Sequence, residues 1–255
     1  SKTEIIMGIG FVSGVLVYMF IFMYGTMVMR GVIEEKTNRV IEVIISSVKP
    51  FQLMIGKIFG VALVGLTQFI LWIILTIIIS SLAEVLFLNN NFNNDLNAQQ
   101  SSVILSEISN INQYLNLEGI FFSFLFYFIV GYLMYSALFS SIGSAVDAEA
   151  DTQQFILPIT IPLIISFILI QPIMENPDGP LAFWMSMIPF TSPIIMMVRI
   201  PFGVNSWEII CSMIILIFSF IFFTWIASKI YRVGILMYGK KASFKDLYKW
   251  ITYKE

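Results

Sequence analysis

The sequence predicts an all-α integral membrane protein, and three observations lead to that fold class. Hydrophobic residues make up 58% of the 255 residues, whereas charged residues make up only 12%. A soluble domain usually carries about 25% charged residues, so this chain lacks the polar surface that a water-soluble fold requires. The apolar residues also fall in long runs whose central parts contain no Asp, Glu, Lys or Arg. These observations exclude a soluble globular domain, a disordered chain and a small disulfide-bonded scaffold.

Five apolar stretches are long enough to cross a bilayer as helices, since about 20 residues suffice. Although Ile, Val and Phe are also common in buried strands, strands are much shorter than these runs. Glycines recur four residues apart at Gly10 and Gly14 and again at Gly56 and Gly60, which favours close helix contacts. In chain order we place the spans at about 5–29, 58–88, 119–146, 155–174 and 207–228.

The Lys and Arg residues predict the orientation of the chain. Twelve of the 14 lie either between the first and second spans or after the fifth. An even number of spans separates these two segments, so they share a side, and basic residues gather on the cytoplasmic side. We therefore expect a multi-pass protein of the cell (inner) membrane with a cytoplasmic C-terminus. The same parity puts Ser1 outside, and we expect the native protein to begin earlier, with a further span before residue 1.

The segment from about 32 to 48 predicts an amphipathic helix at the cytoplasmic surface, and Pro50 then ends or bends it. Glu35 and Arg39 are spaced as a favourable ion pair on such a helix. A polar face of mixed sign suits a protein partner better than a lipid surface, which favours Lys and Arg; a helix that merely anchors the loop is the alternative. One face carries Ile33, Thr37, Val40, Ile41, Ile44 and Val48, and the other carries Glu35, Asn38, Arg39, Glu42 and Ser46.

The segment from about 181 to 200 predicts an external re-entrant hairpin. It contains two apolar pieces that are each too short to span a bilayer, and prolines bound them. A cap that packs over the bundle is an equally good interpretation. If the hairpin closes the outer exit, the candidate gate residues are Pro189, Ser192, Pro193 and Arg199.

The residues that the chain lacks restrict its chemistry. It contains no histidine, a single cysteine, no phosphate-binding glycine loop and no cluster of metal ligands. We therefore expect neither catalysis nor a cofactor, and any energy for transport has to come from another subunit. Thr67 and Gln68 are possible pathway residues, although an interhelical hydrogen bond is the more common role of a mid-span Gln. Glu208 lies near a span end and is expected to be interfacial.

Several motifs together resemble a known family. A span leads into Gly31-Val-Ile-Glu-Glu-Lys-Thr-Asn-Arg-Val-Ile-Glu, a Gly56-Lys57 pair opens the next span, and a proline-bounded hairpin precedes the last one. This pattern resembles the permease subunit of ABC-2 type exporters. The closing Arg232-Val-Gly-Ile-Leu-Met-Tyr-Gly-Lys-Lys and Phe244-Lys-Asp-Leu-Tyr-Lys-Trp are similar to the branch of bacterial sodium-extruding permeases.

The resemblance implies a fold and a set of partners. Each permease core would have six spans, so the first span and an extracellular domain would precede residue 1. Two cores would associate as a homodimer or a heterodimer, and cytoplasmic ABC ATPase subunits would dock on the helix at about 32–48. The coupling residues would be Glu34, Glu35, Lys36, Arg39 and Glu42.

We therefore expect the permease subunit of an ATP-driven exporter of sodium or an amphiphile, with ATP hydrolysed on its partner. Membrane lipid is an expected partner and nucleic acid is not. Two alternatives remain at this stage. One is a structural or assembly protein on a permease-like fold, and the other is an ion pathway without an ATPase, which would require ionisable groups buried in the membrane.

Overall fold

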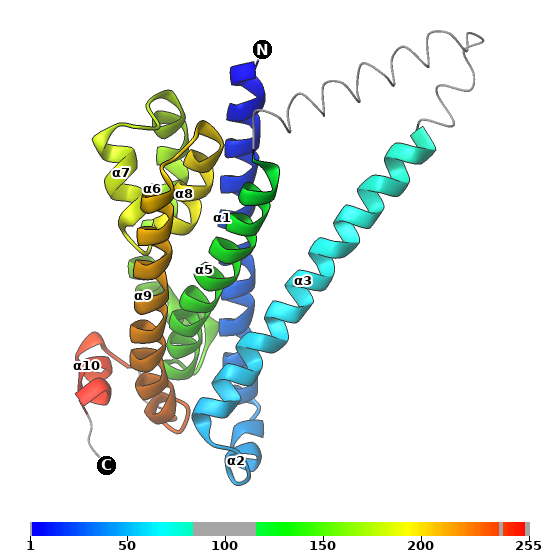
Figure 1. The fold of residues 1–255 in the computed structure, drawn as a ribbon. Coiled ribbons are helices and arrows are strands. Elements are labelled where there is room, and N and C mark those ends of the chain that lie inside the picture. Colours follow the sequence, from blue (N-terminus) through cyan, green and yellow to red (C-terminus); the bar gives the residue numbers. More distant parts are fainter. Residues whose placement is uncertain (1, 84–115, 240–241, 253–255) are drawn as a thin grey trace. The chain divides into compact units, whose positions relative to one another are not determined.

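The computed structural model describes residues 2–83, 116–239 and 242–252, and within these ranges the chain is helical with no strand (Figure 1). In chain order the elements are α1 (Lys2–Thr37), α2 (Val40–Ile45), α3 (Pro50–Ala83), α5 (Leu117–Ala145), η2 (Glu149–Thr152), α6 (Gln153–Glu175), α7 (Pro180–Met187), α8 (Ser192–Arg199), η3 (Ile200–Phe202), α9 (Ser206–Gly234) and α10 (Phe244–Thr252).

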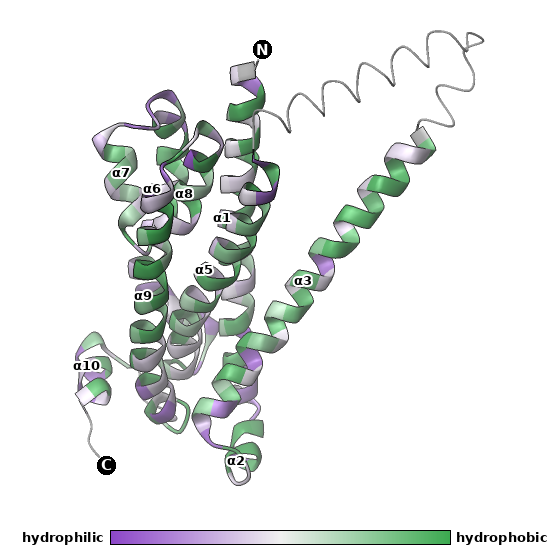
Figure 2. Cartoon of the chain, in the orientation of Figure 1, coloured by the Kyte–Doolittle hydropathy of each residue, from purple (hydrophilic) through white to green (hydrophobic). Residues whose placement is uncertain are grey.

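Five of these helices, α1, α3, α5, α6 and α9, are long and apolar enough to cross a membrane, which confirms the five apolar helices predicted from the sequence. Figure 2 shows hydrophobic residues along their length. Their ends differ from the predicted ones, because charged residues extend the helices beyond the apolar runs. Thus α1 continues to Thr37 and α9 to Gly234. The predicted end of the second span, 84–88, lies outside the described residues.

The chain divides into two compact units. One consists of residues 1–62 and 122–255, and the other of residues 63–121. In the second unit, Thr67 lies on α3 and its hydroxyl donates to the Leu63 carbonyl of the same helix at 2.8 Å. Gln68 follows it on the same helix. The charged sites described below all belong to the first unit.

The short helix α8 forms the centre of the first unit. All of its residues are buried, and it contacts α1, α6, α7 and α9. Close approach is possible because glycines face it. A Cβ atom added at Gly10 would lie 2.7 Å from the Val198 carbonyl oxygen, and one at Gly131 of α5 would lie 2.9 Å from Pro193. The first glycine pair therefore packs within the chain, as its spacing predicts. Around Gly56 no described atom lies within 4 Å of an added Cβ.

The two apolar pieces of the predicted hairpin are the short helices α7 and α8. Pro180 occupies the first turn of α7 and Pro193 that of α8, positions where proline's missing N–H costs nothing. The turn between the helices is held from α5, because the Tyr135 hydroxyl donates to the Phe190 carbonyl at 2.6 Å. Whether this pair enters a bilayer from one side stays a prediction.

Candidate functional site

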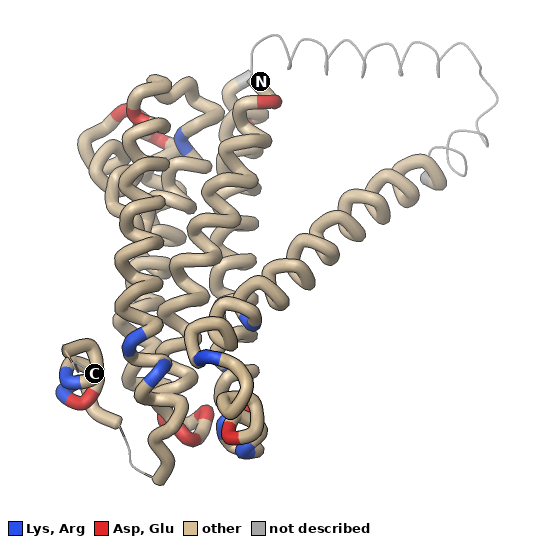
Figure 3. The backbone as a smooth tube through the Cα atoms, turned by 60° about the horizontal axis from the view of Figure 1, so that its bottom comes forward, with Lys and Arg blue, Asp and Glu red and all other residues tan. Residues whose placement is uncertain are grey.

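Charged residues of the first unit gather at two ends of its helices (Figure 3). We call the end that carries α2, the α5–α6 turn and the C-terminal end of α9 the basic end. The opposite end, with α7, the C-terminal end of α8 and the start of α9, is called the hairpin end. Each end holds an ion pair whose cation is buried, Lys36 at the basic end and Arg199 at the hairpin end.

At the basic end, the Lys36 ammonium is only 1% exposed. Its Nζ lies 2.9 Å from Oδ1 of Asp147 and donates to the Ser144 carbonyl at 2.8 Å. The other carboxylate oxygen of Asp147 accepts a hydrogen bond from the Gly239 N–H at 2.7 Å. One buried ammonium thus joins the end of α1, the α5–α6 turn and the residues that follow α9.

Tyr238 closes this cluster from the side of the chain end. Its ring centroid lies 5.7 Å from the Lys36 Nζ, within the range of a cation–π contact. Burial raises the pKa of the Tyr238 phenol, and the carboxylates of Glu42 and Asp147 add to this effect while Arg39 opposes it. The phenol therefore stays neutral and able to donate a hydrogen bond near neutral pH.

A second ion pair at this end joins α1 to α3. The Lys57 Nζ lies 2.6 Å from Oε2 of Glu35, and both side chains are partly buried. Close by, the Tyr132 hydroxyl of α5 donates to the Ile58 carbonyl at 2.8 Å. The pairing corrects the expectation that Glu35 binds Arg39, since α3 supplies a less exposed partner.

The predicted helix at about 32–48 is not one element. Its first part belongs to α1, Arg39 adopts a left-handed conformation with φ 54°, and α2 spans only Val40–Ile45. Lys36 and Ile41 explain the break, because both are buried. Five residues of continuous α-helix would point them about 140° apart. The left-handed residue turns the chain so that both side chains face the bundle.

The five predicted coupling residues therefore have different environments. Lys36 is buried and paired with Asp147 within the chain, and its predicted role in coupling to an ATPase stays a prediction. Glu35 is occupied by Lys57. Glu34, Arg39 and Glu42 are exposed. Beside them on α2, Val40 is 46% and Val43 is 73% exposed.

At the hairpin end, Arg199 is 2% exposed at the end of α8. Its Nη2 donates to Oε2 of Glu208 on α9 at 3.0 Å, and its Nη1 donates to the Ser186 hydroxyl of α7 at 2.6 Å. Its Nε donates to the Pro177 carbonyl at 2.7 Å. Asn205 in turn donates to Oε1 of Glu208 at 3.3 Å. One guanidinium therefore fastens α7, α8 and α9 together.

A serine cluster extends this network along α9. The Ser212 hydroxyl donates to the Ser186 carbonyl at 2.8 Å and lies 3.2 Å from the Ser192 hydroxyl. Of the predicted gate residues, Arg199 and Ser192 are thus linked through Ser186 and Ser212. Pro193 packs on α5 and Pro189 lies in the turn between α7 and α8.

Sequence reasoning missed Glu208, which was expected to be interfacial. The residue is 7% exposed and is the charge partner of Arg199. One signal could have found it. An arginine inside an apolar segment requires an acidic partner, and Glu208 is the next carboxylate along the chain.

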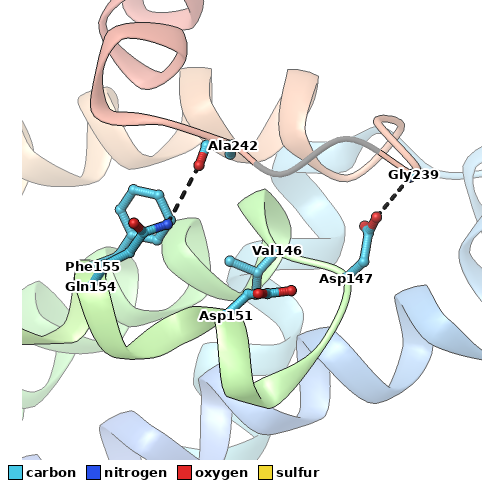
Figure 4. A pocket seen from close by; sticks show the side chains of 7 residues that line it. All are labelled: Val146, Asp147, Asp151, Gln154, Phe155, Gly239 and Ala242. Atoms are coloured by element: carbon cyan, nitrogen blue, oxygen red, sulfur yellow. Dashed lines mark hydrogen bonds between the residues drawn. The ribbon is translucent and has the colours of Figure 1, made fainter.

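A cavity of about 190 Å³ lies at the basic end, between the α5–α6 turn and the residues after α9 (Figure 4). Asp147 and Asp151 contribute its carboxylates, and the Gln154 amide donates to the Ala242 carbonyl at 3.5 Å. In the described ranges no three His, Cys, Asp or Glu side chains are grouped as metal ligands. The cavity is lined by Val146, Asp147, Asp151, Gln154, Phe155, Gly239 and Ala242.

A model of the ABC-2 family of transporter proteins matches residues 4–229. The chain belongs to this family. It is 30% identical over 245 residues to an uncharacterised protein of Bacillus subtilis, a match that covers 94% of this chain and 54% of that protein. It is also 30% identical over 247 residues to an uncharacterised protein of Methanocaldococcus jannaschii, covering 96% of this chain and 54% of that protein. The chain thus spans about half the length of these relatives, and no solved structure matches it.

Family membership gives the two ends of this ABC-2 protein a context. ABC-2 proteins are the membrane components of transporters, which confirms the resemblance found in the sequence at the level of the family. The sodium-extruding branch is not distinguished by this match and stays a prediction. We therefore interpret the ion pairs at the two ends as contacts between helices rather than as catalytic groups.

Proposed function

We propose that this ABC-2 protein is the permease subunit of an ATP-driven exporter and that a separate ATPase subunit binds it at α2. The observation that carries the proposal is an exposed surface between α1 and α3, which we call the α2 surface. It mixes both charges with two unpartnered valines, a composition typical of protein contacts rather than of a lipid surface. It consists of Glu34, Arg39, Val40, Glu42 and Val43.

The contacts behind the α2 surface explain how a movement there would reach the spans. Ile41 anchors α2 in the bundle with no exposed area. The Lys36–Asp147 pair ties the end of α1 to the α5–α6 turn, and the Glu35–Lys57 pair ties it to α3. Because both pairs hold a largely buried ammonium against a carboxylate of another segment, we expect these helix ends to move together with the adjoining α2. ATP-driven displacement of α2 would therefore tilt α1 and α3.

The outward step is assigned to the hairpin end. In this conformation α8 is buried on all sides, so a substrate can leave there only if α8 moves. The Arg199 contacts with Glu208 and Ser186 hold α8 closed. A second copy of the chain and the polar side chains Thr67 and Gln68 would complete the pathway for sodium or an amphiphile.

The buried charges bear on the alternative of an ion pathway without an ATPase. Such a pathway requires ionisable groups that face the moving ion. Arg199 and Glu208 are the described candidates, but each bonds to the other and to further groups of the chain. They fasten helices together and are not open to a passing ion. The exporter is therefore the better interpretation.

The proposal is tested by co-purifying the permease with its candidate ATPase subunit. Glu42→Lys and Arg39→Glu each reverse a charge on the α2 surface and should reduce the amount of bound ATPase by about tenfold, as expected for charge reversal in an interface. Glu118→Lys reverses an exposed charge at the start of α5 and is the matched control. Full retention of the ATPase by both α2 variants would refute docking at this surface.

The substrate is addressed in a second experiment. The permease and ATPase are reconstituted in liposomes, and ATP hydrolysis is measured with sodium or with a cationic amphiphile on the ATPase side. The proposed role requires that one of them stimulates hydrolysis and accumulates on the other side. Hydrolysis that responds to neither, with an assembled complex, would favour a structural role for the chain.

A further inference from the structure

Helix α10 (Phe244–Thr252) has two chemically different faces and follows the last span. Side chains at helical spacing place Phe244, Leu247, Tyr248 and Ile251 on one face. Lys245, Asp246 and Lys249 lie on the other. None of its residues is buried. A capping box stabilises the first turn of α10. The Ser243 N–H donates to the Asp246 carboxylate, and the Asp246 N–H donates to the Ser243 hydroxyl.

Contacts with α9 locate α10 relative to the end of that span. The Lys229 ammonium of α9 donates to the Ile251 carbonyl at 3.1 Å and lies 3.9 Å from the ring centroid of Trp225. At the start of α10, the Phe244 and Phe155 rings lie 4.9 Å apart. Trp and Lys at the end of an apolar span mark the boundary between hydrocarbon and water. Helix α10 therefore lies at the level of the lipid headgroups.

One strip of α10 stays largely exposed, although one side of its Phe244 ring packs against Phe155. Leu247, Trp250 and Ile251 are half-buried. Phe244 and Tyr248 are 56% and 69% exposed. The exposed Lys245 and Lys249 adjoin these two rings. Two aromatic rings beside two lysines form what we call the α10 strip.

We propose that the α10 strip binds an anionic lipid surface. Phe244 and Tyr248 insert at the boundary between headgroups and acyl chains, and Lys245 and Lys249 lie against the lipid phosphates. This inference needs only that α9 spans the membrane, and it does not rest on the proposed export.

Charge and position together favour lipid over a protein partner. The α10 strip presents ammonium groups without an exposed carboxylate between them, whereas the α2 surface mixes both signs. The chain from residue 229 onward also contains Lys229, Arg232, Lys240, Lys241, Lys245, Lys249 and Lys254 against Asp246 and Glu255. Each basic residue near an anionic membrane adds to the attraction. The rings of Phe244 and Tyr248, at the depth of the lipid headgroups, can contact lipid without a protein partner.

The test uses the full chain with one labelled cysteine, in a Cys211→Ser background. A bimane fluorophore is placed at Tyr248→Cys on the strip, or at Trp250→Cys on the opposite side of the helix as the matched control. The protein is reconstituted in vesicles of phosphatidylcholine, with or without phosphatidylglycerol, that contain a headgroup-labelled nitroxide lipid. We expect bimane quenching at position 248 to exceed that at 250 by about twofold, and phosphatidylglycerol to increase it.

Two further measurements separate the contributions. Lys245→Gln together with Lys249→Gln should lower the ratio of bound to free α10 on the order of tenfold and abolish the response to phosphatidylglycerol. Amide hydrogen exchange on the unlabelled chain should show α10 more protected in phosphatidylglycerol vesicles than in phosphatidylcholine alone, which requires no substitution.

Three results would count against the proposal or against part of it. Equal quenching at 248 and 250 together with unchanged exchange would overturn the proposal. Quenching that ignores phosphatidylglycerol would overturn the role of the lysines. If lipid has no effect but the added ATPase protects position 248, the strip binds protein instead.

Discussion

Removal of the Glu208 carboxylate tests whether the hairpin end is held by its buried ion pair. In Glu208→Ala the Arg199 guanidinium, 2% exposed, loses its only charged contact shown in the structure and keeps those to Ser186 and Pro177. Breaking a buried pair on one side costs about 3–5 kcal/mol. Because two neutral acceptors remain, we expect the lower end, about 3 kcal/mol, or on the order of a hundredfold in the unfolding equilibrium constant.

The chain supplies a matched control for this prediction. Arg30 and Glu149 also form an arginine–glutamate pair, with a shorter separation of 2.7 Å, but their side chains are 62% and 60% exposed. Exposed pairs contribute about 0–1 kcal/mol. Glu149→Ala should therefore cost less than about 1 kcal/mol, although its N–O distance is the shorter one. Burial and not distance decides the difference.

The assay is equilibrium unfolding of the purified chain in mixed micelles, followed by tryptophan fluorescence. Arg199→Met combined with Glu208→Leu removes both charges and should cost less than Glu208→Ala alone, since no uncompensated charge remains. Equal losses in Glu208→Ala and Glu149→Ala would refute the reasoning. The reasoning would also be refuted if the double variant lost as much stability as the Arg199→Met and Glu208→Leu single variants lose together.

Three further predictions concern other contacts. Asp147→Ala should destabilise the chain by about 2 kcal/mol more than Lys36→Met in the same unfolding assay, because only the first leaves a buried ammonium without its carboxylate. Gly10→Val should lower the thermal midpoint in detergent, because the new Cβ would lie 2.7 Å from a backbone oxygen, whereas Gly56→Val should leave it within error. Gly203→Val should cost about 1–2 kcal/mol by chemical unfolding, since Gly203 has φ 95°, which L-residues rarely adopt; an unchanged midpoint would contradict this.

Much of the fold could be predicted because it depends on local composition. The five apolar helices are visible as runs of residues, and the hairpin pieces are visible because prolines bound them. The positions of the helix ends were predicted less accurately. The start of α3 at Pro50 and the end of α1 at Thr37 lie outside the predicted spans. At the end of α1, Glu35 and Lys36 pair with other segments.

The site was predicted less completely, and Lys36 shows why. The periodicity places Lys36 among the charged residues of a predicted surface helix. Its partner Asp147, however, lies on the α5–α6 turn, far along the chain. Arg39 then takes a left-handed conformation that no local pattern indicates. At the other end Arg199 was predicted as a gate residue, but the sequence did not indicate that it is buried and paired with Glu208 of a different helix.

The sequence by itself determined that this is a helical membrane protein, and its motifs already resembled the ABC-2 family. Hydropathy and motif spacing are properties of consecutive residues, so they can be read before the chain folds. Only the tertiary structure decided which charges are buried and which are free to meet a partner. Those outcomes depend on the desolvation of each group by segments far along the chain, and that desolvation exists only once the helices have packed.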